Sequence, residues 1–185
     1  MMIALDKRSV GKEARAMSEA LDRRAALEQL MAAHGGSLLR MCTLQLRDRH
    51  LAEDAVQETF LKAYRKLDSF RGEASELSWL TSIAIHVCRD MQRGAWLKHI
   101  DRRVDVTALP ETGQEDRYPD RTVIREVMAL PPKYREVVVL RYYQGMTLQE
   151  TADALRLSLT ATKARLFRAN ATLRDRLKEW YDEAE

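Results

Sequence analysis

The chain has 185 residues, which suits one large domain or two small helical ones. It carries 31 Lys plus Arg against 28 Asp plus Glu, a formal charge of +3, so any nucleic-acid site must be a local basic patch. Glycine and proline together make up only 11 residues, about half of average usage, and neither occurs over 37–71 or 146–185. Few turns fit into such stretches. The composition therefore predicts an all-α fold and excludes a β-sandwich or a β-barrel.

The sequence also argues against several functional classes. The two cysteines, Cys42 and Cys88, are isolated, which favours buried thiols in a reducing cytosol over a disulfide. No apolar run approaches the ~18 residues of a membrane span, and the N-terminus has no apolar signal core, so we expect a cytoplasmic protein without membrane insertion. No metal-ligand pair, Gly-rich phosphate loop or GxSxG motif occurs. We therefore expect no cofactor and no metal, and an enzyme is a remote alternative.

The N-terminal part of the chain is predicted to be helical throughout. Residues 12–33 form a highly charged helix that we expect Gly35-Gly36 to end. Two helices follow over 37–67 and meet near Arg47–His50. In the second, apolar or small residues recur at the i, i+3, i+4, i+7 spacing of one buried face. They lie at positions 52, 55, 56, 59, 60, 63 and 67.

The second of these helices has a further stripe on a different side, which mixes acid, amide and apolar side chains. A solvated surface explains such a stripe, and so does a docking surface for a basic partner helix. Its members are Asp54, Gln57, Glu58 and Leu61.

A loop over 69–78 and a helix over 79–93 come next. The loop holds an aromatic and a basic residue, and the outer stripe of the helix holds polar and basic ones. Basic side chains beside a loop aromatic suit single-stranded nucleic acid, because bases stack on rings while the backbone lies along cations. The candidate residues are Phe70 and Arg71 in the loop, and Ser82, His86, Arg89 and Arg93 in the helix.

The composition then changes. Residues 105–120 hold five acids with two prolines, which predicts a linker and places a domain boundary near 97–119. The second half begins with a helix over 120–130 that stops at Pro131-Pro132. A helix over 133–144 follows and ends at Gly145, a residue type favoured at helix C-caps.

Thr147-Leu-Gln-Glu150 is a capping box that begins a short helix. A tight connection at 156–158 and a long helix over 160–180 complete a helix-turn-helix layout, although any αα-hairpin shares it.

The long helix has two distinct faces. Leu166, Ala169, Leu173 and Leu177 form its core stripe, and a basic face lies opposite, at the N-terminal end that a recognition helix turns to the major groove. Residues 156–178 carry a local charge of +6, as phosphate binding requires, although a solvated basic surface is the alternative. The predicted DNA contacts are Lys163, Ala164, Arg165, Phe167 and Arg168.

Two segments of the chain resemble the extracytoplasmic-function (ECF) sigma factors of bacterial RNA polymerase, members of the sigma-70 family. The first is AEDAVQETFLKAY (52–64) with SWLTSIAIHVCRDMQR (78–93), and the second is LPPKYREVVVLRYYQGMTLQETADALRLSLTATKARLFRANATL (130–173). The resemblance implies two small helical domains joined by a flexible linker. Its implied limits are an N-terminal arm over 1–24, region 2 over 25–96, an acidic linker over 97–119 and region 4 over 120–185.

The resemblance also implies roles for the stripes. The stripe of Asp54, Gln57, Glu58 and Leu61 would dock on the clamp helices of the polymerase β′ subunit, and region 4 would meet the β flap. The loop and helix of region 2 would melt and read the −10 element, and the helix over 160–177 would read the −35 element. An anti-sigma factor would hold the protein inactive. A plain helix-turn-helix regulator and a sigma-like decoy are the alternatives.

The chain departs from the family pattern at several positions. His86 replaces the usual Asn, which bears on −10 preference. Arg156 replaces a glycine of the turn, and a non-glycine residue in a left-handed conformation costs about 1–2 kcal/mol, so we expect a different turn there. The recognition helix opens with Thr160-Ala161 in place of Gly-Thr, and Asn170 replaces a common Arg.

Overall fold

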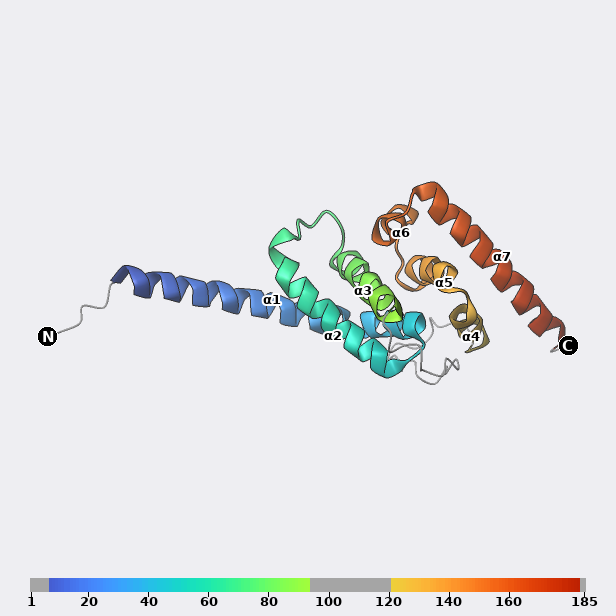
Figure 1. The fold of residues 1–185 in the computed structure, drawn as a ribbon, viewed down its shortest axis with the longest axis horizontal. Helices are drawn as coiled ribbons and strands as arrows, with labels where there is room; N and C mark the ends of the chain where they lie inside the picture. The colour runs from blue at the N-terminus through green and yellow to red at the C-terminus, as the bar shows by residue number, and fades with distance from the viewer. Residues whose placement is uncertain (1–6, 94–120, 184–185) are drawn as a thin grey trace.

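The computed structural model describes residues 7–93 and 121–183, with side chains from Met17 to Arg93 and from Arg121 to Lys178. Every regular element within these ranges is a helix, which confirms the all-α prediction. The helices form two lobes, the first lobe over 7–93 and the second lobe over 121–183 (Figure 1). The expected linker over 97–119 lies outside the described residues.

The first lobe is a bundle of α1 (Lys7–Leu46), α2 (Arg49–Lys66) and α3 (Glu76–Arg93), with the short 3-10 helix η1 (Leu67–Ser69) after α2. The predicted junction between α1 and α2 is confirmed: Arg47 has a positive φ of 60°, and the Asp48 side chain caps α2 by accepting from the Leu51 N–H at 2.9 Å. The core of the lobe pairs large aliphatic side chains with small ones that let the helices approach closely. Fully buried members include Leu38, Met41, Leu44, Ala52, Ala55, Leu80, Ala84 and Val87.

The predicted break at Gly35-Gly36 was wrong, because α1 runs through both glycines without a positive φ at either. A glycine inside a helix costs roughly 0.5–1 kcal/mol relative to alanine. Leu30 and Leu38, on either side of the pair, are both buried, so tertiary packing keeps α1 helical through the two glycines. The N-terminal part of α1 projects beyond the bundle in Figure 1.

The second lobe contains α4 (Arg121–Ala129), α5 (Pro132–Val138), the π-helical segment η4 (Val139–Tyr143), α6 (Leu148–Leu155) and α7 (Leu159–Glu183). The helix predicted over 133–144 is therefore an α-helix that widens into a π turn, where the Gln144 N–H donates to Val139 O at 3.1 Å. Gly145 ends it with a φ of 68°, as predicted.

The buried side chain of Arg135 stabilises the second lobe by hydrogen bonds to backbone carbonyls. Its side chain is 1% exposed and donates to Met128 O at 2.7 Å and to Leu130 O at 3.2 Å, carbonyls at the end of α4. It also reaches Gln45 O of α1 in the first lobe at 2.9 Å. A buried cation thus satisfies backbone acceptors in both lobes.

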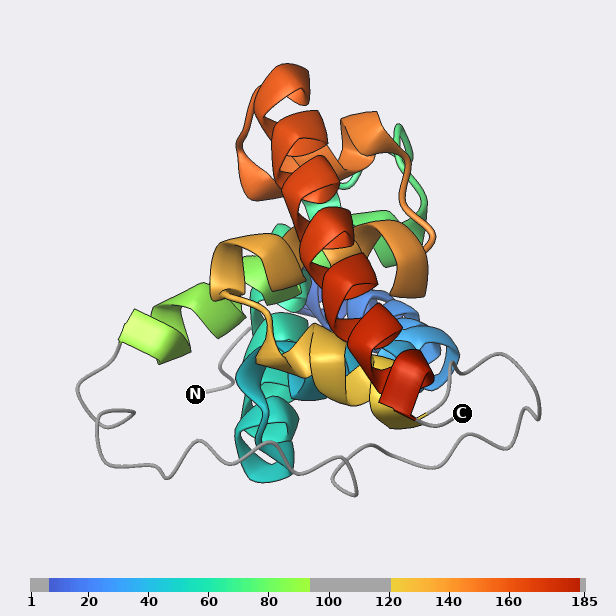
Figure 2. The same cartoon turned by 90° about the vertical axis from the view of Figure 1, so that its right-hand side faces the viewer.

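The two lobes pack directly against each other, which the sequence did not predict (Figures 1 and 2). The main contact is between α3 and α6, and α1 also touches α4, α5 and η4. Several hydrogen bonds cross between the lobes. They join Arg89 to Glu136 and Leu155, Ser78 to Glu150, Ser37 to Gln144, and Arg135 to Gln45.

Candidate nucleic-acid interface

The capping box that begins α6 is present as predicted. The Glu150 N–H donates to the Thr147 hydroxyl at 3.1 Å, and the Thr147 N–H donates to the Glu150 carboxylate at 2.8 Å. These hydrogen bonds, that of the Thr147 backbone first, hold the pKa of Glu150 below its usual value. The box therefore carries a charged carboxylate at the positive end of the helix dipole at neutral pH.

The turn after α6 has the left-handed conformation despite Arg156, so the expectation of a different turn was wrong. Arg156 has φ 55° and ψ 49°, and the Leu157 N–H donates to Ala152 O at 2.9 Å across it. This pattern satisfies the last carbonyls of α6, which offsets part of the cost of a side chain in this region. The Ser158 hydroxyl then accepts from the Ala161 N–H at 3.1 Å at the start of α7.

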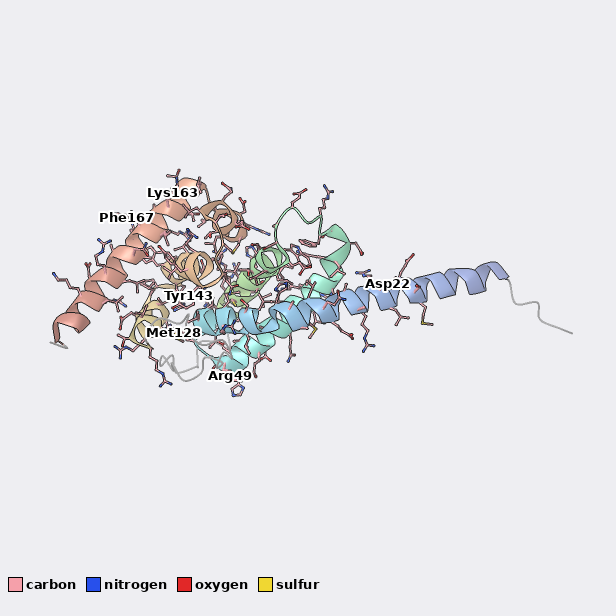
Figure 3. The ribbon with its side chains drawn as sticks, turned by 180° about the vertical axis from the view of Figure 1, so that it is seen from behind. Asp22, Arg49, Met128, Tyr143, Lys163 and Phe167 are labelled. Atoms are coloured by element: carbon pink, nitrogen blue, oxygen red, sulfur yellow. The ribbon has the colours of Figure 1, made fainter. Side chains whose placement is uncertain are left out.

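The two faces of α7 separate as predicted. Ala169 is fully buried, and Leu166 and Leu173 pack partly buried against the core. Figure 3 shows the side chains of Lys163 and Phe167 on the outer side of α7, and Phe167 is 76% exposed. Four of the five predicted contacts are exposed and Arg165 is half-buried. The exposed ones are Lys163, Ala164, Phe167 and Arg168.

A hydrogen bond that the sequence did not reveal fixes this helix against η4. The Asn170 amide donates to the Tyr142 hydroxyl at 3.0 Å. Asn170 stands where the resemblance implied an Arg, so the departure replaces a positive charge with a positioning contact. Only the fold brings the two residues together, since they are 28 positions apart.

The stripe of α2 that was predicted to dock on a partner lies on one exposed face. Asp54 and Gln57 are exposed, and Leu61 is 54% exposed. Glu58 is half-buried and pairs with Lys62 at 3.4 Å. The four residues form an acidic surface with an exposed leucine at its C-terminal end.

The predicted outer stripe of α3 is half-buried except for Arg93, which is exposed. Ser82, His86 and Arg93 line a cleft of about 680 Å³ between α2, α3 and α6. One wall of the cleft is cationic. The sequence analysis did not include Lys62, Arg65 and Lys66 among the candidate residues, although these three basic residues lie close together just before the loop. Its charged residues are Lys62, Arg65, Lys66, Arg93 and Arg156 against Asp90 and Asp153.

The loop aromatic packs against another aromatic side chain of the first lobe. Phe70 is half-buried, and its ring lies against Trp79 with a centroid distance of 4.8 Å and an interplanar angle of 33°. Gly72 provides the positive φ of 72° that the loop needs, and Arg71 is exposed beside it. Phe70 thus supports the loop through Trp79, which itself lines the cleft.

Charged side chains of the second lobe act on two residues of the α3 stripe. The Arg89 guanidinium donates twice to Glu136, at 2.7 Å each, and this ion pair raises its pKa. Burial, followed by the nearby charges of Arg156 and Arg89, lowers the pKa of His86 from its usual 6.5. His86 is therefore a neutral imidazole at pH 7.

Comparison with known proteins agrees with this architecture. Residues 30–98 match the family described as "Sigma-70 region 2", and residues 121–173 match "Sigma-70, region 4". The chain is 35% identical over 160 residues to the ECF RNA polymerase sigma factor SigM of Mycobacterium tuberculosis, spanning 81% of this chain and 76% of that protein. The chain belongs to the ECF sigma factors of the sigma-70 family. It is thus a transcription initiation factor, a class without catalytic activity of its own.

Other relatives of this sigma factor span a similar share of the chain. ECF RNA polymerase sigma factor SigW of Bacillus subtilis is 27% identical over 168 residues, covering 83% of this chain and 90% of that one. CnrH, solved in complex with the cytosolic domain of CnrY, superimposes with a TM-score of 0.61 and 27% identity over 84% of this chain and 90% of CnrH. RpoE of Bartonella quintana, solved with the anti-sigma factor NepR, has a TM-score of 0.65 and 23% identity over 85% and 97%, a likeness of fold.

Three further observations concern the described residues alone. None of their helices combines the length and apolar character needed to cross a membrane. Their His, Cys, Asp and Glu side chains do not gather in threes that could hold a metal ion. Cys42 and Cys88 are both buried free thiols, as predicted.

Proposed function

We propose that this sigma factor directs core RNA polymerase to promoters by reading the −35 element with α7 and the −10 element with α3 and its preceding loop. The observation that carries the proposal is the outer face of α7, where Lys163, Phe167 and Arg168 project from the start of the second helix of a capped helix-turn-helix. Such a face can combine phosphate contacts, a bidentate guanine contact and an apolar contact to a thymine methyl. Arg165 and Ala164 complete the set.

We assign the domains as an arm over 1–24, region 2 over 25–96, a linker over 97–119 and region 4 over 120–185. The acidic surface of α2, made of Asp54, Gln57, Glu58 and Leu61, docks on the β′ clamp helices, and region 4 meets the β flap. Promoter DNA is bound as duplex by α7 and as melted strand by Phe70, Arg71, Ser82, His86, Arg89 and Arg93. An anti-sigma factor controls the protein, which acts in the cytoplasm. Support for an anti-sigma partner comes from RpoE, which has been solved with the anti-sigma factor NepR, and CnrH has been solved with the cytosolic domain of CnrY.

The −35 assignment is tested with paired substitutions on α7. Arg168→Ala should weaken binding to a −35 duplex by about 1–3 kcal/mol if the guanidinium makes a bidentate base contact. Arg174→Ala removes the same charge from an exposed position on another side of the helix and is the matched control. Equal losses for the two variants would mean that α7 contributes only a diffuse charge, and the −35 proposal would fail.

The polymerase-docking assignment is tested separately. The double substitution Asp54→Arg with Gln57→Ala should abolish co-purification with core polymerase while far-UV circular dichroism stays unchanged. Asp22→Arg, a charge reversal at an exposed site of α1, is the control that should retain binding. A sigma-like decoy predicts no run-off transcription even with polymerase bound, and a plain regulator predicts a palindromic site with no polymerase association. The exposed basic face of α7 argues against the decoy, and the match to region 2 argues against the plain regulator.

A further inference from the structure

One side chain of the proposed −10 surface is fully engaged by the other lobe. Arg89 of α3 donates through Nε to Glu136 Oε1 and through Nη2 to Glu136 Oε2, both at 2.7 Å. Its Nη1 donates to the carbonyl of Leu155, the last residue of α6, at 3.2 Å. All three guanidinium nitrogens are thus occupied by residues of the second lobe, and the Glu136 side chain is only 7% exposed.

A second contact lies nearby, at the start of the same helix. The Ser78 hydroxyl donates to Glu150 Oε1 at 2.8 Å, so the capping-box glutamate of α6 also binds the first lobe. In α1, the Ser37 hydroxyl donates to Gln144 Oε1 and the Gln144 amide donates to the Ser37 carbonyl, both at 3.2 Å. These contacts hold the lobes together with the Arg135–Gln45 hydrogen bond and the shared apolar core, and the bidentate ion pair is the strongest type of polar contact among them.

We propose that the Arg89–Glu136 ion pair is an intramolecular latch, which keeps the second lobe over the DNA-facing side of α3 until an anion replaces Glu136. The inference rests on the proposed −10 role of this side of α3. Glu136 occupies the Nε and Nη2 donors that a phosphate would use for bidentate binding, so the latch and a bidentate DNA contact at this edge exclude each other. DNA binding and lobe separation are consequently coupled, because only the open form has a free Arg89.

The charges around the latch make the closed form easy to open. Arg156, which follows the last residue of α6, lines the cleft whose other wall carries Lys62, Arg65 and Lys66 of α2. Like charges from the two lobes repel each other across this cleft, while Glu136 attracts Arg89. The bidentate pair is thus the strongest type of polar contact that opposes this repulsion. Its loss should therefore shift the equilibrium toward the open form.

The latch is tested on the free full-length chain by measuring the distance between the lobes. Spin labels are attached through noncanonical residues at His50 and Ala129, two exposed positions on different lobes, so that the native cysteines stay untouched. The wild-type chain should give a short, narrow distance distribution. Glu136→Gln and Arg89→Gln should each add a longer, broader component, with the open-to-closed ratio rising about tenfold or more.

Two controls separate the latch from general destabilisation. Glu53→Gln removes the same charge from the Arg49–Glu53 pair within α2 and should leave the distances unchanged. The double variant Arg89→Gln with Glu136→Gln should open the lobes no further than either single variant, because the two side chains act as one unit. Unchanged distances in both single variants, or additive effects in the double variant, would overturn the latch.

The DNA side of the inference has its own readout. A fluorescent pool of single-stranded DNA of random sequence should bind Glu136→Gln more tightly than wild type, and Arg89→Gln should not share this gain because its cation is lost. If the lobes open but neither wild type nor Glu136→Gln binds the pool, the latch stands and the −10 role of α3 falls. If both bind with equal affinity although the lobes open, the second lobe does not cover the DNA surface and the proposal is overturned.

Discussion

Arg156→Gly changes two properties of the protein at once, each for its own physical reason. Arg156 is one of the two non-glycine residues with a positive φ among those that the structure describes. A left-handed conformation costs a residue with a side chain about 1–2 kcal/mol, and glycine avoids most of that cost. Glycine also has more conformational freedom in the unfolded chain, which lowers the stability of the folded state by roughly 0.5–1 kcal/mol. The expected net gain in stability is therefore about 0.5–1 kcal/mol. In a chain of this size it should raise the melting temperature by roughly 1–4 °C.

The same substitution should alter the titration of His86. Burial is the largest cause of the lowered pKa of His86, and the charge of Arg156 is the next. The other charged groups around the imidazole are Arg89, which lowers the pKa further, and Asp90 and Glu136, which raise it. Removal of the Arg156 guanidinium should therefore move the pKa of His86 up toward 6.5 without reaching it, because the burial remains.

Both effects can be measured on the same samples, by calorimetric unfolding and by NMR titration of the His86 ring. Arg156→Ala removes the charge but keeps the left-handed strain, and Arg156→Lys keeps both. Glycine should raise the melting temperature more than alanine does, whereas glycine and alanine should both raise the pKa of His86. A melting temperature that is equal for Gly and Ala would refute the strain argument. If the pKa of His86 is the same in the wild type and in the Gly and Ala variants, α6 does not lie against α3 in solution.

Three further outcomes are expected. Thr147→Ala should lower the free energy of unfolding by about 1 kcal/mol, measured by urea denaturation, because α6 loses its N-cap side chain and Glu150 loses the hydroxyl that donates to it. Since the folded pKa of Glu150 is lowered, first by the Thr147 backbone, its stabilisation is present above the usual value of 4.5 and is lost as the pH falls through the folded pKa. Glu150→Gln should accordingly flatten the pH dependence of unfolding in that acidic window and leave it unchanged at pH 7. Leu80→Ala, at a fully buried position of α3, should cost about 2–5 kcal/mol by the same denaturation assay, and a loss below 1 kcal/mol would contradict the packing of the first lobe.

Features set by short-range chemistry could be predicted from the sequence. The capping box of Thr147 and Glu150 needs only residues three positions apart, and Gly145 needs only its own freedom at positive φ. The two faces of α7 follow from the helical repeat, which placed Phe167 outside and Ala169 inside. Such features depend on backbone geometry that any helix shares, so no tertiary information was required.

Features that depend on packing could not be predicted in the same way. The local propensity of Gly35-Gly36 predicts the end of a helix. Because leucines on both sides of the pair are buried in the core, α1 nevertheless continues through it. The contact of the Phe70 ring with Trp79 spans a loop, and no local pattern predicted it. At the glycine pair, a local preference worth about 1 kcal/mol is small compared with the burial of large side chains.

The contact of Arg89 with the second lobe could not be predicted for a more general reason. A helical repeat distinguishes only the core side of α3 from the other side, and it cannot tell solvent from a second lobe whose glutamate is 47 positions away. Arg89 was a candidate for DNA because its guanidinium offers several donors to an anion, and Glu136 satisfies those same donors. A surface built to bind phosphate is therefore also complementary to any carboxylate that the chain can bring to it. The prediction of an anion-binding stripe and the finding of an ion pair between the lobes express one property of the sequence, and competition between the two anions gives the protein a means of regulating its own DNA contacts.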